Sequence, residues 1–112
     1  MKKDLSAKKV ICRQLKGRQR FLRLLGDGNK VNGLRCGLVT LKPKEEIGEH
    51  KTTAKEEVII VLKGNAIICY SKNKIIKAVK DDFVYIPPNI LHNVKNFGRK
   101  ILQYVYVTTK VT

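Results

Sequence analysis

Short apolar segments that alternate with turn residues constrain this chain more than any other feature. The segments are FLRLL, LRCGLVTL, VIIVL, AIICY, IIKAV, FVYI and ILQYVYVTT. Between them lie GDGN, VNG, SKNK, PPN and NFGRK, which are rich in residues typical of turns. β-branched and aromatic residues suit a pleated sheet, and strands of this length and spacing are typical of sandwiches and barrels. The pattern therefore predicts an all-β protein.

Two regions carry more particular expectations. The residues SKNK at 71–74 separate two apolar segments as a hairpin turn would. The stretch 5–25 is the one place where a helix could form, because some of its apolar residues have rough helical spacing: Leu5, Ile11, Leu15 and Leu22. Gly17, and the alternation of basic residues with Gln19 and Phe21, favour strands there instead.

The length of 112 residues predicts a single domain, 1–112. A chain of this size buries only about 60–68% of the surface that its unfolded form exposes. The segment VIIVL is apolar at consecutive positions, as in a strand that is covered on both faces. Since a barrel interior covers only one face, we expect a homodimer through the outer face.

The net charge of +15 is unevenly distributed. Residues 1–35 carry 11 Lys and Arg against 2 acids, which predicts a basic N-terminal arm or strands over 1–33. A positive surface attracts small anions, anionic membranes or nucleic acid. The lysines are scattered, however, and few aromatic residues lie among them, so a platform for stacking bases is not indicated. We therefore expect a solvated basic surface, with nucleic acid an unlikely partner.

The expected compartment is the cytoplasm. No stretch approaches the roughly 18 apolar residues of a membrane helix, and the N-terminus lacks the apolar run of a secretory signal. No membrane partner is expected. The three cysteines, Cys12, Cys36 and Cys69, are odd in number and form no CxxC pair, so we predict that they are buried and reduced.

The two histidines, His50 and His92, are the residues that indicate chemistry. His50 enters a strand, and Glu57 opens the run VIIVL seven residues later. A strand ending near His50 and an antiparallel return starting at Glu57 would bring these side chains together. Imidazole and carboxylate are good ligands for divalent transition metals. From the residue types alone, a structural role for each histidine is the more common one.

Two motifs carry a resemblance to the cupin family over residues 34–108. The first reads Gly, five residues, His-x-His, three or four residues, Glu, six residues, Gly, and it is matched by His50, Glu57 and Gly64. The second reads Gly, five residues, Pro-x-Gly, two residues, His, three residues, Asn, and it is matched by Pro87, His92 and Asn96. The departures are Lys44, Asp81 and Asn89 at glycine positions and Thr52 at the second histidine.

The resemblance implies an antiparallel jelly-roll barrel with a metal in its mouth. The ligands would be His50, Glu57 and His92, and the ion would be Mn, Fe, Ni or Zn. Threonine is a poor ligand at neutral pH, so Thr52 leaves a set of two histidines and one carboxylate, like that of non-haem iron enzymes. Open positions on such an ion could chelate a small anionic substrate.

The matched turn residues Gly64, Pro87 and Asn96 would shape corners of the fold. Asn89 can replace glycine because asparagine visits the left-handed region more readily than most residues. Lys44 and Asp81, in contrast, indicate that the backbone there need not be left-handed.

Three classes of function remain open. The first is a metal-dependent enzyme, such as a decarboxylase, dioxygenase or isomerase, for a small anionic molecule. The second is a non-catalytic cupin that binds a small ligand, and the third is binding of nucleic acid. No catalytic residue is predicted. Thr52 and Gln103 are candidate pocket residues. Gln103 is the one polar side chain within ILQYVYV, and it could equally face solvent. Three tyrosines are expected to pack: Tyr85, Tyr104 and Tyr106.

Overall fold

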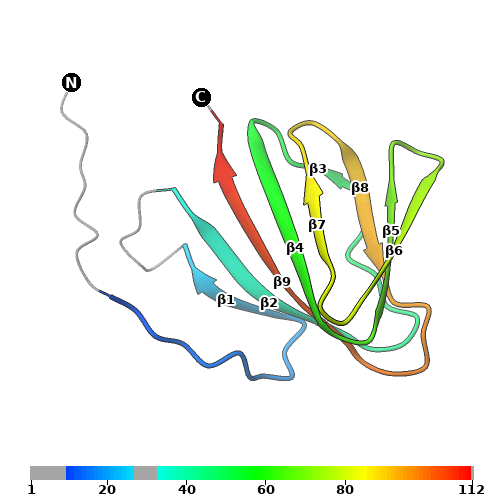
Figure 1. Ribbon diagram of the computed structural model, residues 1–112, viewed down its shortest axis with the longest axis horizontal. Coiled ribbons are helices and arrows are strands. Elements are labelled where there is room, and N and C mark those ends of the chain that lie inside the picture. The colour runs from blue at the N-terminus through cyan, green and yellow to red at the C-terminus, as the bar shows by residue number, and fades with distance from the viewer. Residues whose placement is uncertain (1–9, 27–32, 112) are drawn as a thin grey trace.

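Nine strands make up the regular structure of the described part of the chain (Figure 1). The computed structural model describes residues 10–26 and 33–111. The strands are β1 (Phe21–Leu25), β2 (Arg35–Leu41), β3 (His50–Lys51), β4 (Lys55–Lys63), β5 (Asn65–Tyr70), β6 (Lys74–Val79), β7 (Phe83–Ile86), β8 (Leu91–Lys95) and β9 (Leu102–Lys110). Every pairing between them is antiparallel. Within these residues, no helix is long and apolar enough to cross a membrane.

The strands form two sheets that enclose one core. The larger sheet has the order β1-β2-β9-β4-β7, and the smaller has the order β3-β8-β5-β6. The core draws side chains from both sheets, including Ile59 and Val61 of β4 and Ile68 of β5, each at most 1% exposed. Alternation along β4 turns Ile60 to the outside, where it is 37% exposed. The prediction of an all-β antiparallel fold is confirmed.

The outer face of the larger sheet carries an apolar row that crosses four strands. The register pairs Leu38 with Val105, Val105 with Ile60, and Ile60 with Phe83. Directly paired residues place their side chains on the same face. The β7 end of the row is open to solvent, because Phe83 is 65% exposed. β4 therefore has apolar side chains on both faces, and its outer face is only partly covered.

Left-handed backbone at two corners corrects the expectation for Lys44 and Asp81. Both residues have φ of 74°, a conformation that costs a side-chain-bearing residue roughly 1–2 kcal/mol. Main-chain hydrogen bonds hold these corners: Lys44 N donates to Asn96 O at 2.8 Å, and Asp81 N donates to Val61 O at 2.9 Å. Asn89, with φ of 65°, is left-handed as expected.

Gly64 and Asn96 shape the connections between strands that are consecutive in the chain but lie in different sheets: β4 to β5 and β8 to β9. Gly64 has φ of 85°, and a Cβ there would lie 2.5 Å from the carbonyl oxygen of Ile101. The buried Asn96 amide donates to the carbonyls of Leu41 and Lys100, each at 2.9 Å, and its oxygen accepts from Gly98 N at 3.0 Å. Both are therefore structural corner residues, as the sequence indicated.

Local expectations for the turns and the N-terminal region had mixed outcomes. The hairpin turn at 71–74 is confirmed, since it joins β5 to β6. Strands were favoured over 5–25, but β1 covers only 21–25, and residues 10–20 form neither strand nor helix. The part of that stretch before residue 10 lies outside the described residues.

The prediction that the cysteines are buried is wrong. Cys12 is exposed, while Cys36 and Cys69 are partly buried. Cys12 lies in the irregular segment before β1, where no strand neighbours cover it. All three thiols are free.

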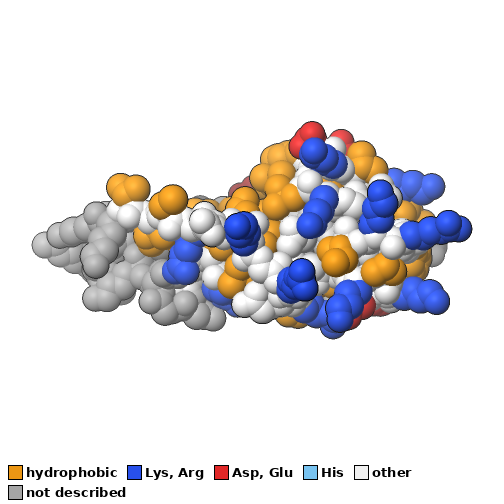
Figure 2. All heavy atoms as spheres, turned by 90° about the horizontal axis from the view of Figure 1, so that it is seen from below, with side chains coloured by type: hydrophobic (Ala, Val, Ile, Leu, Met, Phe, Trp, Pro, Cys, Tyr) orange, Lys and Arg blue, Asp and Glu red, His pale blue; other side chains and the backbone are white. Residues whose placement is uncertain are grey.

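Basic side chains are spread over one long face of the molecule. Figure 2 shows Lys and Arg side chains mostly separated from one another by hydrophobic and uncharged atoms. On the face shown, these side chains form no continuous basic stripe of the kind that follows a nucleic-acid backbone.

Candidate metal centre

The two histidines lie opposite each other on neighbouring strands. The register of β3 and β8 pairs His50 directly with His92, and the ring centroids are 4.2 Å apart with an angle of 58° between the planes. His92 is 1% exposed because β8 lies between β3 and β5 in the sheet, whereas His50 is exposed on the short edge strand β3. One buried and one accessible imidazole thus face a common space.

Glu57 reaches this space from the opposite sheet. Its Oε1 lies 3.1 Å from Nε2 of His92, and the residue is only 8% exposed. The sequence correctly indicated that His50 and Glu57 approach each other, but the expected hairpin between them is wrong. β3 and β4 belong to different sheets, because the chain crosses from one sheet to the other through residues 52–54. His50 and Glu57 therefore face each other across the space between the sheets.

Backbone carbonyls set the same tautomer in both imidazoles. Nδ1 of His50 lies 2.9 Å from Gly48 O, and Nδ1 of His92 lies 2.8 Å from Ile90 O. A carbonyl can only accept a hydrogen bond, so each Nδ1 must carry a proton. In a neutral ring, Nε2 then keeps the lone pair that a metal needs. Support of this kind, from the second ring nitrogen to a carbonyl, is typical of metal-binding histidines.

The donor set fits a divalent transition metal. One ligand atom from each of His50, Glu57 and His92 lies within 4.8 Å of the others. Ligands bonded at about 2.0–2.2 Å lie closer together than this, so the site needs only a small inward adjustment. His50 is exposed on the edge strand β3, so its side chain has room to make this adjustment. Two imidazoles and one carboxylate leave further positions on the ion open.

The contact between His92 and Glu57 changes the pKa of His92. Burial lowers the pKa of His92, but hydrogen bonds to Glu57 and to the carbonyl of Ile90, together with the charge of Glu57, raise it overall. In the absence of a metal, a protonated Nε2 of His92 can donate a hydrogen bond to the Glu57 carboxylate. A bound cation would take the place of that proton.

A cavity of about 210 Å³ opens beside the three donor atoms. Thr52, the candidate pocket residue that replaces a family histidine, lines it together with His50, Glu57 and His92. The remaining walls come mainly from the larger sheet and from Ile47 and Val94. Thr52 directly follows β3 and is partly buried.

Gln103, the other candidate pocket residue, does not line this cavity, but it lines a separate pocket together with Gly17 and Thr40. Its Nε2 donates to Gly17 O at 3.1 Å and to Oγ1 of Thr40 at 3.0 Å. Strict alternation along β9 explains the outcome, because the neighbouring Tyr104 points into the core and Gln103 therefore points out. The residue ties the segment before β1 to the outer face of the larger sheet.

Two tyrosines that were expected only to pack also line the cavity. Tyr104 and Tyr106, with Thr108, occupy alternate positions of β9 and so share its inner face. This period of two is visible in ILQYVYVTT and was the signal that could have identified them. Burial, and then the charges of Glu57 and Tyr106, raise the pKa of Tyr104 far above its usual value. The Tyr104 hydroxyl therefore stays protonated.

Comparison with known proteins identifies the family. The family model for the cupin domain matches residues 37–108. An RmlC-like cupin family protein of Methanocaldococcus jannaschii, with a double-stranded β-helix fold, has a TM-score of 0.76 at 16% identity, covering 92% of this chain and 91% of that one.

Two further solved structures are larger than the matched region. The cupin domain of Schizosaccharomyces pombe Cnp3 has a TM-score of 0.72 at 15% identity, covering 81% of this chain and 64% of that one. A predicted oxalate decarboxylase of Thermotoga maritima has a TM-score of 0.65 at 19% identity, covering 69% of this chain and 66% of that one. At these identities the likeness shows the fold alone. No curated protein matches the chain. With the family model spanning most of its length, the chain belongs to the cupin domain family.

Proposed function

We propose that this protein binds a divalent transition metal, Mn, Fe, Ni or Zn, through His50, Glu57 and His92, and uses it to hold a small anionic molecule. The observation that carries the proposal is the convergence of three donor atoms from two different sheets within 4.8 Å. When bound, the ion would act as a Lewis acid: the small anion could chelate it, and the ion would polarise the oxygen atoms that it binds.

The volume of the cavity suits a small anion. This volume of about 210 Å³ corresponds to about seven water molecules at the volume of liquid water. A molecule of the size of oxalate fits that space, and the Thermotoga maritima relative is described as a predicted oxalate decarboxylase. Decarboxylation, dioxygenation and isomerisation all remain candidate reactions, and a purely ligand-binding role is the alternative.

The residues of this chain would position the anion in distinct ways. Glu57 and the two imidazoles provide the donors, and backbone carbonyls hold both rings in orientation. The protonated Tyr104 hydroxyl keeps a hydrogen-bond donor in the cavity wall. The inner faces of β2 and β9 form one wall of the cavity and exclude water from that side of the anion. These features favour a small, oxygen-rich ligand over a large one.

Elemental analysis of untagged protein tests the metal directly. We expect about one Mn, Fe, Ni or Zn ion per chain, and we expect His50→Ala and His92→Ala each to remove it, because two remaining ligands rarely hold a divalent ion. His50→Ala is the sharper test, since His50 is exposed and its loss should not affect folding. Glu49→Gln is the matched control, because it changes an exposed carboxylate next to His50.

The outcomes separate the candidate functions. Stoichiometric metal that survives His50→Ala or His92→Ala would show that the ligand assignment is wrong. Protein that stays free of metal after incubation with each ion, yet binds oxalate in the cavity, would favour the ligand-binding alternative. Loss of metal in both histidine variants, with metal retained by Glu49→Gln, supports the proposed centre.

A further inference from the structure

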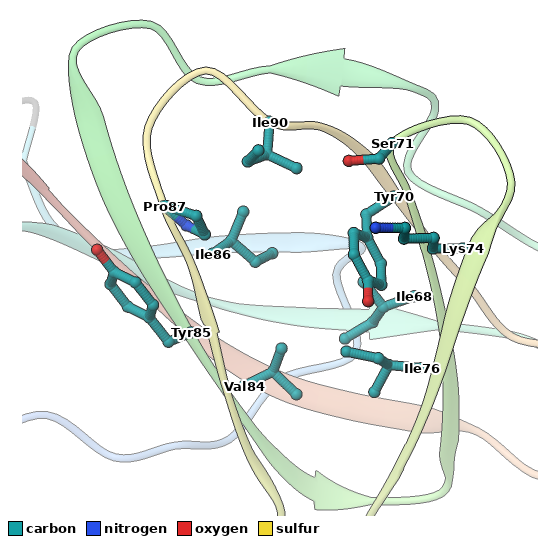
Figure 3. A pocket seen from close by; sticks show the side chains of 10 residues that line it. All are labelled: Ile68, Tyr70, Ser71, Lys74, Ile76, Val84, Tyr85, Ile86, Pro87 and Ile90. Atoms are coloured by element: carbon teal, nitrogen blue, oxygen red, sulfur yellow. The ribbon is translucent and has the colours of Figure 1, made fainter.

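A second and larger cavity lies in the seam between the two sheets (Figure 3). Its volume is about 310 Å³. It opens between β6 and β7, which are edge strands of different sheets and do not pair with each other. The strands approach at the β6–β7 turn and diverge away from it (Figure 1), so the space between the sheets can be reached from the side.

The seam cavity is separate from the candidate metal cavity, with which it shares no lining residue. The register pairs Tyr70 with His92 and Ile86 with Glu57. Paired residues lie side by side on one face of a sheet, and Tyr70 and Ile86 line the seam cavity. The contact between His92 and Glu57, which spans the two sheets, therefore lies between the two cavities.

The walls of the seam cavity are mainly aliphatic. Six apolar residues face it from strands of both sheets and from the loop after β7: Ile68, Ile76, Val84, Ile86, Pro87 and Ile90. Figure 3 shows several of these side chains directed towards one another across the space, while the Tyr85 ring points away from it. Such walls favour the body of an aliphatic molecule.

One side of the cavity carries a positive charge. Lys74, at the start of β6, directs its amine into the space, near the Ser71 hydroxyl and the Tyr70 ring (Figure 3). No carboxylate lines this cavity, and none lies within ion-pair distance of Lys74 in the part of the chain that the structure describes. An apolar space bordered by a lysine that has no ion-pair partner among the described residues suits a molecule with an apolar body and one negative head.

We propose that the seam cavity binds an amphipathic monocarboxylate, with its hydrocarbon body between the isoleucines and its carboxylate at Lys74 and Ser71. The volume of about 310 Å³ equals that of about ten water molecules, which accommodates a ligand of about ten non-hydrogen atoms. This site goes beyond the proposed metal function, because it uses none of the metal-binding residues. It would let the protein respond to a small organic acid independently of the anion at the metal.

Octanoate is the probe that tests this site, with 1-octanol and octylammonium as matched molecules that change only the head group. Isoleucine δ1-methyl NMR reports on the cavity directly. We expect octanoate at low-millimolar concentration to shift the signals of Ile68, Ile76, Ile86 and Ile90, and to leave the exposed Ile101 unchanged. Octanol should bind more weakly, and octylammonium more weakly still.

Two variants separate the head-group contact from the apolar contact. Lys74→Met keeps the aliphatic stem but removes the charge. It should therefore weaken octanoate binding by up to about fivefold, the upper end of the range of an exposed ion pair, and leave octanol binding unchanged. Lys72→Met, in the adjacent turn, is the control and should change neither. Ile76→Trp, at a position already 38% exposed, should fill the space and abolish binding of both molecules.

The results that would overturn the proposal are specific. Octanoate shifts that centre on Ile47, which lines the metal cavity, would place the molecule at the wrong site. Equal binding of octylammonium, or equal effects of Lys74→Met and Lys72→Met, would refute the role of Lys74. Absence of saturable shifts would refute the site itself. His50→Ala should strip the metal yet keep octanoate binding, so failure of the metal proposal is distinguishable from failure of this one.

Discussion

Replacing Thr52 with histidine tests whether the metal centre is one ligand short. Thr52 lines the same cavity as His50, Glu57 and His92, and it lies two residues beyond His50. An imidazole at this position should reach the ion and complete a set of three histidines and one glutamate. We therefore expect Thr52→His to raise metal affinity.

Two effects of Thr52→His can be estimated: the gain in metal affinity and the loss of stability in the absence of metal. A change in the groups that hold or orient a metal alters affinity by about 10- to 100-fold, which is about 1.4–2.7 kcal/mol. A buried imidazole without a partner would lower stability by about 1–3 kcal/mol. Thr52 is only partly buried and borders a cavity of about 210 Å³, so the stability loss without metal should lie near the lower end of that range.

A competition titration against a chelator, run beside thermal melts with and without metal, measures both effects. Thr53→His is the matched control, because Thr53 is exposed and does not line the cavity. The added ligand should also close an open position and weaken chelation of a small dicarboxylate. Unchanged metal affinity with a lower melting temperature, or an equal gain in Thr53→His, would refute the incomplete site.

Four further predictions follow from the same structure. Since the pKa of His92 is raised beside Glu57, the metal-free protein should lose stability as the pH rises through that raised pKa, while metal affinity increases. Melts and metal titrations that do not depend on pH would contradict this. The apolar outer row predicts a homodimer that Ile60→Lys or Phe83→Lys dissociates, and light scattering that gives a 12.8 kDa monomer of the unmodified protein would contradict it. Nucleic acid should bind only weakly and without sequence preference at physiological salt, and nanomolar sequence-dependent binding in a filter assay would overturn this. Asn96→Ala should lower the free energy of unfolding by about 1–3 kcal/mol in urea, because it leaves the buried carbonyl of Leu41 without its partner and removes two partly buried hydrogen bonds, to Lys100 O and from Gly98 N.

Strand positions and the core could be predicted from the sequence, whereas the contacts between the two sheets could be predicted only in part. Alternation along β4 and the turn at 71–74 are local features, and local features determine strand direction. The approach of His50 to Glu57 was anticipated, but through a hairpin, because sequence proximity suggests pairing more readily than a crossing between sheets. The seam cavity depends on where β6 and β7 end relative to each other, and no local pattern encodes that.

Backbone conformation at the corners was the clearest failure of residue-based reasoning. Lys44 and Asp81 have side chains that disfavour the left-handed region, yet both adopt it. Hydrogen bonds to Asn96 and Val61, both distant in sequence from the residues they hold, outweigh the local cost. The position in the family motif, where glycine is usual, was therefore a better guide to the backbone than the residue that occupies it.

The buried contact between His92 and Glu57 is the strongest argument that the centre is functional. Both residues are less than 10% exposed within a small, otherwise largely aliphatic core. Well-packed apolar residues of similar volume are often as stabilising as a buried ion pair, or more so. A chain of 112 residues also has only a small core, so each polar residue in it replaces a larger share of the apolar packing. Stability alone is thus a poor explanation for this pair. A metal accounts for it better, because a metal requires the same two side chains together with the accessible imidazole of His50 that faces them.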